Sequence, residues 1–166
     1  MGLRLVTYTA AVLTLLAVVP TPATPAISDT KIVVAKDKKD KCKRSRKFNE
    51  HQVSFGKRAV RAGRCVTDEY GGVKTIGSRP GHHPTGGRAL DIMTNTRGSC
   101  KAGRPVGFKV ANYLMDNAKR LGVMYIIWSN RYWSAGTKKR PVTKWRYMGR
   151  GGCTHGHYDH VHVSFK

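Results

Sequence analysis

The sequence HVHVSF at residues 160–165 alternates strictly between polar and apolar side chains, as a half-buried β-strand does. A strand's period of two directs one set to a common face, namely His160, His162 and Ser164. The core-facing set is then Val161, Val163 and Phe165. Two imidazoles side by side on a rigid strand suit a divalent metal ion, and the simpler alternative is a pair of exposed strand histidines.

The preceding sequence supplies partners for this strand. Apolar runs predict four further strands, at residues 73–76, 89–93, 123–128 and 131–134. The run at 123–128 is expected to be buried on both faces, with a turn at 129–130 leading into its hairpin partner. Helical periodicity predicts two helices, at residues 49–64 with Asn49 as the N-cap and at residues 105–121.

Length and charge limit the possible functions. The 166 residues give room for one compact domain, and a hydrophobic content of 40% is enough for a core. Lys and Arg number 31 against 9 Asp and Glu, so the formal net charge is +22. This excess is unusual for an enzyme of small molecules. It predicts attraction to an anionic partner such as nucleic acid, an acidic cell wall or a charged membrane surface.

Residues 1–26 have the order of a secretory signal peptide: a basic start, an apolar run over residues 5–19, then small residues and prolines. A membrane anchor is the alternative, but this run is shorter than the roughly 20 apolar residues that span a bilayer. We therefore expect a secreted, extracellular protein with no membrane span after cleavage. Residues 27–47 are expected to form a basic flexible arm that tethers the chain to a polyanion, and residues 48–166 the folded domain.

The cysteines support export. Cys42, Cys65, Cys100 and Cys153 include no CxxC pair, so a zinc site built on thiolates is not expected. In an oxidising compartment four cysteines form two disulfides, for which three pairings exist. Loop-closure entropy favours Cys42–Cys65 together with Cys100–Cys153.

Six of the seven histidines fall in two clusters, one at residues 82–83 and the other at residues 155–162. His83 lies in a loop rich in Gly and Pro, and Asp91 lies on the strand that follows this loop. If the loop folds back, both side chains reach one ion, and a mixed set of His, Asp and His is compatible with catalytic zinc. The alternative for Asp91 is an ordinary carboxylate paired with Arg88 or a lysine.

Three segments, in this order, resemble zinc D-alanyl-D-alanine peptidases and hedgehog-type metallopeptidases, a superfamily marked by an early His and Asp and a late HxH. They are HPTGGRALDIM at residues 83–93, YIIWSNRYWS at residues 125–134 and HYDHVHVSF at residues 157–165. The likeness is to the secreted actinobacterial branch and covers about residues 48–166. It implies a small single α+β domain, in which an antiparallel sheet carries the metal site and helices pack against the sheet.

The resemblance also implies roles for individual residues. It makes His83, Asp91 and His162 the ligands of one Zn²⁺ ion. Asp159 would be the general base for the attacking water and then the proton donor to the leaving amine. His160 would line the site and help to hold the oxyanion, and Arg79 would stabilise charge on the scissile carbonyl.

One departure from the family pattern concerns the loop before Asp91. The family has six residues between the ligand His and Asp, whereas seven separate His83 from Asp91 because Gly86-Gly87 doubles a single glycine. An extra glycine can bulge from a loop without moving either ligand, or it can displace His83.

The expected function is that of a secreted zinc peptidase that cleaves the stem peptides of bacterial peptidoglycan and is held on anionic cell-wall polymers by its charge. Nucleic acid is a possible partner but is not favoured. A monomer is expected. Two alternatives remain: a basic metal-dependent nuclease, which charge favours although no nuclease motif is found, and a non-catalytic wall-binding or toxin-like protein with a relic metal site, which the double glycine favours.

Overall fold

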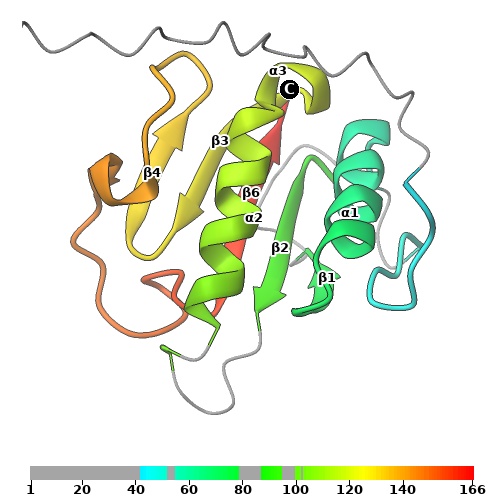
Figure 1. The fold of residues 1–166 in the computed structure, drawn as a ribbon, viewed down its shortest axis with the longest axis horizontal. Helices are drawn as coiled ribbons and strands as arrows, with labels where there is room; N and C mark the ends of the chain where they lie inside the picture. The colour runs from blue at the N-terminus through cyan, green and yellow to red at the C-terminus, as the bar shows by residue number, and fades with distance from the viewer. Residues whose placement is uncertain (1–41, 52–54, 79–86, 95–99, 102) are drawn as a thin grey trace, which may run out of the picture. The chain divides into compact units, whose positions relative to one another are not determined.

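The computed structural model describes residues 42–51, 55–78, 87–94, 100–101 and 103–166 (Figure 1). The predicted signal peptide, most of the basic arm, Arg79, His83 and Gly86 lie outside these residues. Within the described residues no helix has the length and apolar character needed to cross a membrane.

The domain is an α+β fold built on one antiparallel sheet, as predicted. The six strands are β1 (Val73–Gly77), β2 (Ala89–Thr94), β3 (Val123–Trp128), β4 (Arg131–Ser134), β5 (Arg146–Tyr147) and β6 (His160–Phe165). Their order across the sheet is β1-β2-β6-β3-β4-β5, and every pair is antiparallel. The last strand of the chain therefore lies in the middle, between β2 and β3. The five predicted strands are confirmed, and β5 at the edge was not predicted.

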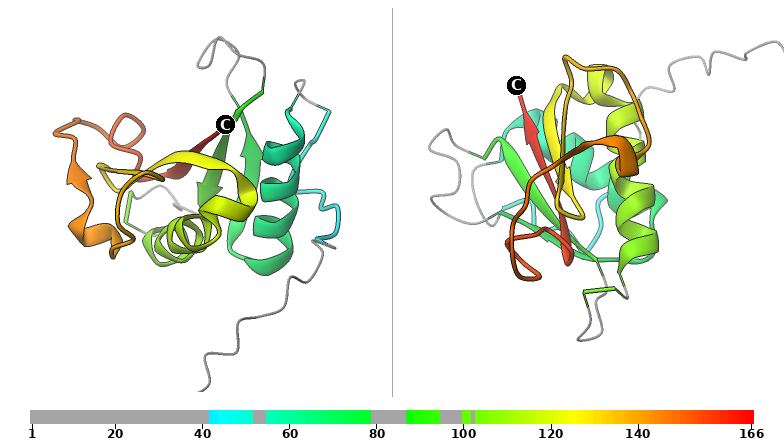
Figure 2. Two further views of the ribbon diagram at one scale, coloured as in Figure 1. Left: turned by 90° about the horizontal axis from the view of Figure 1, so that it is seen from above. Right: turned by 90° about the vertical axis from the view of Figure 1, so that its left-hand side faces the viewer.

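The helices lie on one face of the sheet (Figures 1 and 2). They are α1 (Lys57–Glu69), α2 (Arg104–Asp116) and the single turn α3 (Ala118–Leu121), and a short 3₁₀ helix, η1 (Val142–Lys144), follows β4. The predicted start of the first helix at Asn49 is wrong. The Asn49 side chain instead accepts a hydrogen bond from the backbone N–H of His51, and Gly56 is the N-cap of α1.

The second predicted helix, residues 105–121, is interrupted between α2 and α3. The side-chain amide of Asn117 donates to the carbonyl of Tyr113 at 2.9 Å, and such local bonds compete with continued helix. Gly122, with φ of 69°, then ends α3 in the left-handed conformation that glycine favours.

The core lies between the helices and the sheet. The predicted apolar face of β6, Val161, Val163 and Phe165, is buried there together with Leu90 and Ile126 from the neighbouring strands. The other face of β6 is also largely buried, since none of its six residues is more than 7% exposed. Burial of β3 on both faces was predicted and is wrong at Met124, which is 43% exposed, while Tyr125 is only partly buried.

Both favoured disulfides are confirmed. Cys42–Cys65 joins the N-terminal segment to α1, and Cys100–Cys153 joins the chain before α2 to the loop that precedes β6. The described cysteines include no free thiol. Two disulfides are compatible with a secreted protein.

Candidate functional site

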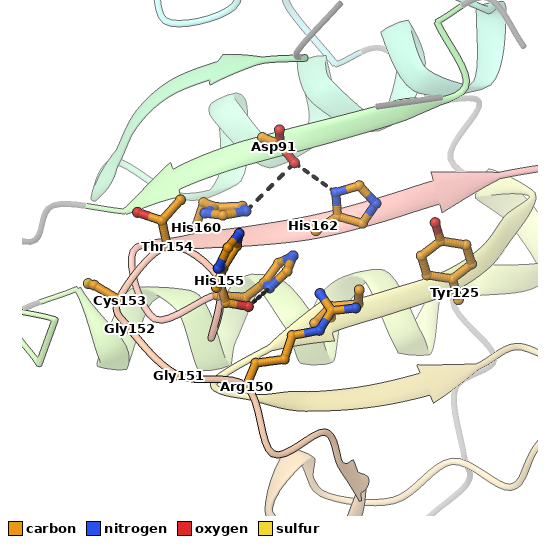
Figure 3. Close-up of a pocket in the computed structure, with 12 residues that line it drawn as sticks. Asp91, Tyr125, Arg150, Gly151, Gly152, Cys153, Thr154, His155, His160 and His162 are labelled. Carbon is orange, nitrogen blue, oxygen red and sulfur yellow. Dashed lines mark hydrogen bonds and ion pairs between the residues drawn. The ribbon is translucent and has the colours of Figure 1, made fainter. Parts of the chain in front are cut away.

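The centre of the site is a cross-strand pair on the sheet face opposite the helices. Asp91 on β2 lies directly across from His162 on β6 in the strand register. The Nδ1 atom of His162 is 2.7 Å from Oδ1 of Asp91, and Nε2 of His160 is 3.8 Å from the same oxygen (Figure 3). Two neighbouring strands therefore hold a carboxylate against two imidazoles.

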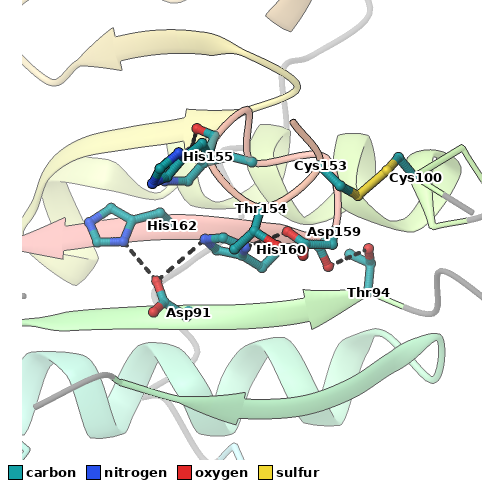
Figure 4. Close-up of polar contacts among 10 residues, drawn as sticks. Asp91, Thr94, Cys100, Cys153, Thr154, His155, Asp159, His160 and His162 are labelled. Carbon is teal, nitrogen blue, oxygen red and sulfur yellow. Dashed lines mark hydrogen bonds and ion pairs between the residues drawn. A yellow bond between two sulfur atoms is a disulfide. The ribbon is translucent and has the colours of Figure 1, made fainter. Parts of the chain in front are cut away.

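A second carboxylate–imidazole pair lies at the start of β6. Oδ1 of Asp159 is 2.6 Å from Nδ1 of His160, and Oδ2 accepts a hydrogen bond from the Thr154 hydroxyl at 2.8 Å (Figure 4). The backbone carbonyl of Asp159 accepts bonds from the N–H and hydroxyl of Thr94. His160 is thus fixed between Asp159 and Asp91.

Sequence reasoning assigned no role to His157, which the fold brings into the same cluster. Its ring centroid lies 4.6 Å from that of His160 and 5.8 Å from that of His162. Its backbone has φ of 52°, so a turn rather than a strand aims this side chain. The period of two that places the side chains of β6 does not apply to residues in such a turn. The only feature of the sequence that could have indicated a role for His157 was its place in the histidine cluster at residues 155–162.

Asp91 and the three histidines of the cluster, His157, His160 and His162, line a cavity of about 620 Å³. The loop over residues 150–155 forms another wall, and Tyr125 of β3 contributes a ring stacked on His162. The volume lies within the range of roughly 300–1,000 Å³ that is usual for ligand sites. Asp159 does not line this cavity, whereas His160 does. The cavity is therefore large enough for a short peptide segment, and Asp159 lies behind it, hydrogen-bonded to two of the lining residues, His160 and Thr154.

Both carboxylates are held in the ionised form. Burial raises the pKa of Asp91, but the hydrogen bond from His162 and the charges of the surrounding imidazoles outweigh burial and leave the pKa below its usual value. Burial likewise raises the pKa of Asp159, and the hydrogen bonds from Thr154 and His160 bring it below the usual value. Anionic oxygens at neutral pH are what a cation or a proton relay requires.

His157 is held neutral. Burial, and then the charge of His160, lower the pKa of His157 to about 4. The unfolded chain protonates this histidine near pH 6.5, so its contribution to stability is present above that pH and is lost as the pH falls toward 4.

We expect His157→Asn to flatten the acid side of the stability profile. Asparagine tolerates the positive φ and does not titrate in this range. In chelator-treated protein, lowering the pH from 7 to 4.5 should cost the wild type about 2 kcal/mol more of unfolding free energy than the variant. Urea denaturation at both pH values measures this difference. The matched control is His155→Asn, at an exposed histidine of the same loop, which should lose as much unfolding free energy as the wild type. An equal loss in the wild type and in His157→Asn would contradict the prediction.

Four of the six predicted site residues come together: Asp91, Asp159, His160 and His162. The other two, His83 and Arg79, lie outside the described residues. Among the described residues, no three His, Cys, Asp or Glu side chains form a group arranged to hold a metal ion. In donor chemistry the cluster nevertheless fits zinc, since an ionised carboxylate and imidazole nitrogens are the ligands that a catalytic zinc ion takes.

Comparison with known proteins relates the chain to one family. No curated protein and no solved structure matches it. The family model described as "VldE, C-terminal domain" matches residues 45–158, which include α1, β1–β5 and the loop that lines the cavity. Because this match covers more than half of the sequence, the chain belongs to the family of the VldE C-terminal domain.

Proposed function

We propose that this protein is a secreted zinc-dependent peptidase that hydrolyses peptide bonds in the stem peptides of peptidoglycan. The observation that carries the proposal is the convergence of Asp91, His160 and His162 on one cavity, with Asp159 hydrogen-bonded to His160 behind it. The pair Asp91–His162 offers metal ligands, and the pair Asp159–His160 offers a group that can move a proton. The three motifs that resemble D-alanyl-D-alanine peptidases support the same reaction.

In this proposal Asp91 and His162, joined by His83 from the loop before β2, hold the zinc ion. Bound zinc would act as a Lewis acid toward the scissile carbonyl. The strand register of β2 and β6 fixes the two described ligands against each other before any ion binds, so little rearrangement is needed.

Proton transfer is assigned to Asp159 and His160 acting as a unit. The imidazole lines the cavity, and the carboxylate behind it is hydrogen-bonded to it at 2.6 Å. Asp159 thus serves as the base through its hydrogen bond to His160. The imidazole of His160 accepts the proton from the attacking water and returns a proton to the leaving amine. Arg79 remains the proposed stabiliser of charge on the scissile carbonyl.

The test is an assay of the purified protein on peptidoglycan-derived peptides and on DNA, with chelator and with zinc added back. We expect cleavage of the peptides that chelator abolishes and zinc restores, with intact DNA. Chelator-sensitive cleavage of DNA alone would identify a nuclease. Retention on cell walls without cleavage of either substrate would identify the non-catalytic alternative.

The proposed partner of the basic surface is an anionic cell-wall polymer. Residues 117–158 contain nine Lys and Arg and no Asp or Glu. Several of these cations, including Lys138, Arg140 and Lys144 between β4 and β5, are exposed. The folded domain thus carries a basic segment in addition to the predicted arm.

We expect replacement of Lys138, Arg140 and Lys144 by glutamine to weaken binding to insoluble cell wall roughly tenfold. Exposed charge pairs contribute about 0.5 kcal/mol each, and about 1.5 kcal/mol corresponds to roughly tenfold in affinity. The measurement is a sedimentation assay across a salt series, because screening should abolish the difference. The control removes the same charge at three scattered exposed lysines outside this segment, Lys57, Lys74 and Lys109. An equal loss in the control would show that net charge alone governs binding.

A further inference from the structure

Arg150 lies at the edge of the cavity, on the wall that faces the histidine cluster. It is exposed and belongs to the residues that line the cavity. Figure 3 shows its side chain extending from the loop into the space between the histidines and Tyr125. The guanidinium is therefore presented to whatever occupies the cavity.

The backbone of Arg150 is fixed although glycines surround it. The side chain of Asn130, which is 1% exposed, donates to the Arg150 carbonyl at 2.6 Å and accepts from the Arg150 N–H at 3.0 Å. Asn130 is itself held by backbone bonds to Gly156 and Met148. Gly149 and Gly152 have φ of 68° and 75°, so without these bonds the loop would be easily deformed. A buried amide thus holds the arginine in place.

No acidic side chain among the described residues forms an ion pair with Arg150. Of the two carboxylates nearest the cavity, Asp91 is engaged by His162 and Asp159 by His160 and Thr154. Among the described residues Arg150 forms no ion pair, and the sequence from 117 to 158 contributes no acid. A guanidinium that has no ion-pair partner can bind a planar oxyanion, such as a carboxylate, through two parallel hydrogen bonds.

We propose that Arg150 is the anchor for a carboxylate of the ligand, so that this cavity selects peptides with a free carboxylate close to the bond held at the histidine cluster. The assignment of this carboxylate to a cleaved peptide rests on the proposed function. Binding of the carboxylate depends only on Arg150 and on the fold that holds it. The carboxylate is either the C-terminal group or an acidic side chain, and the experiment separates the two.

The experiment compares matched peptides on the full mature chain. One pair differs only in a free C-terminal carboxylate against a C-terminal amide, and a second pair differs only in Glu against Gln. Dissociation constants are measured by calorimetry in chelator-treated protein, and kcat and KM are measured with zinc. Arg150→Gln should weaken binding of the preferred carboxylate peptide roughly 10- to 100-fold and change its uncharged partner less than about twofold. Arg150→Lys, which keeps the charge and loses the fork, should lie between.

Two further variants make the result specific. Arg146→Gln removes a neighbouring cation that stacks on the ring of Tyr132 and does not line the cavity, and it should leave both peptides unchanged. Asn130→Gly keeps the left-handed turn, in which Asn130 has φ of 60°, and removes the bonds to Arg150. It should reduce the preference for carboxylate over amide, a ratio that a general loss of stability does not alter.

Equal weakening of carboxylate and amide peptides in Arg150→Gln would overturn the proposal, because it would assign the arginine to the scissile carbonyl or to the loop. Unchanged binding would overturn it as well. Inorganic phosphate that competes better than acetate would also overturn it in favour of a phosphate site. Carboxylate-dependent binding without any hydrolysis would support the anchor and reject the peptidase, so the two proposals fail separately.

Discussion

Replacing His162 by alanine is expected to abolish tight zinc binding and hydrolysis together. His162 is buried and lies directly across from Asp91 in the strand register. It is the proposed zinc ligand on β6. Loss of an outer-shell partner costs roughly 10- to 100-fold in metal affinity or activity, and loss of a ligand should exceed this. Zinc content by mass spectrometry and kcat/KM on a stem peptide measure the two effects.

The matched control for His162→Ala is His155→Ala. His155 also lines the cavity, but it is exposed and meets His157 only through its backbone carbonyl. It should retain zinc and activity within about threefold. Because His162→Ala leaves the half-buried Asp91 without its hydrogen bond to His162, unfolding is measured in parallel, and His162→Gln serves as a better-tolerated second variant. Zinc binding that survives in both His162 variants would reject the ligand assignment.

Asp159→Ala is expected to separate zinc binding from proton transfer. The carboxylate is hydrogen-bonded to His160 and does not line the cavity, so its removal should leave zinc content unchanged. Without it, His160 loses the group that orients it and stabilises its charge, and kcat should fall roughly 100- to 10,000-fold. Full activity on a peptide would show that the proton is moved by another group.

The alternation of HVHVSF was enough to place the site, because a period of two leaves no freedom about which side chains share a face. His160 and His162 therefore lie together as predicted, and the apolar partners enter the core. The disulfide pairings followed from loop length. Alternation does not give the neighbour across the sheet. The family resemblance grouped Asp91 with His162, and the register then shows that the two residues lie directly opposite each other.

The start of the first helix was mispredicted because distant contacts outweigh local signals there. Ile76 of β1 donates its N–H to the carbonyl of Lys47, and Phe48 forms a parallel bridge with Ile76. The ring of Phe48 then packs where Gly63 of α1 has no side chain. Residues 48–51 are thus tied to the sheet and packed against α1 instead of extending it, a tertiary effect that capping residues do not reveal.

The role of the loop before β6 was also beyond the reach of local pattern. His157 and Arg150 lie on it, and both are positioned by the turn of the β3–β4 hairpin, where Ser129 donates to the carbonyl of His157 and Asn130 holds Arg150. The hairpin itself was predicted. Its function as the support of the cavity wall depends on contacts between residues that are about 20 or more positions apart, which spacing along the chain does not encode.

The largest effect on stability is expected for Gly107→Ala on α2. A methyl group at this position would overlap the indole of Trp128, which is completely buried on β3. Alanine is the better helix former by about 1 kcal/mol, but overpacking a filled core costs about 1–3 kcal/mol or more. We therefore expect a net loss of about 2 kcal/mol in unfolding free energy, measured by urea denaturation.

Gly136→Ala, where a methyl group meets no atom, is the control and should be nearly neutral. Combining Gly107→Ala with Trp128→Phe should cost less than the two separate losses together, because the smaller ring makes room for the methyl group. Strict additivity would show that Gly107 is required for some other reason than the close approach of α2 to Trp128.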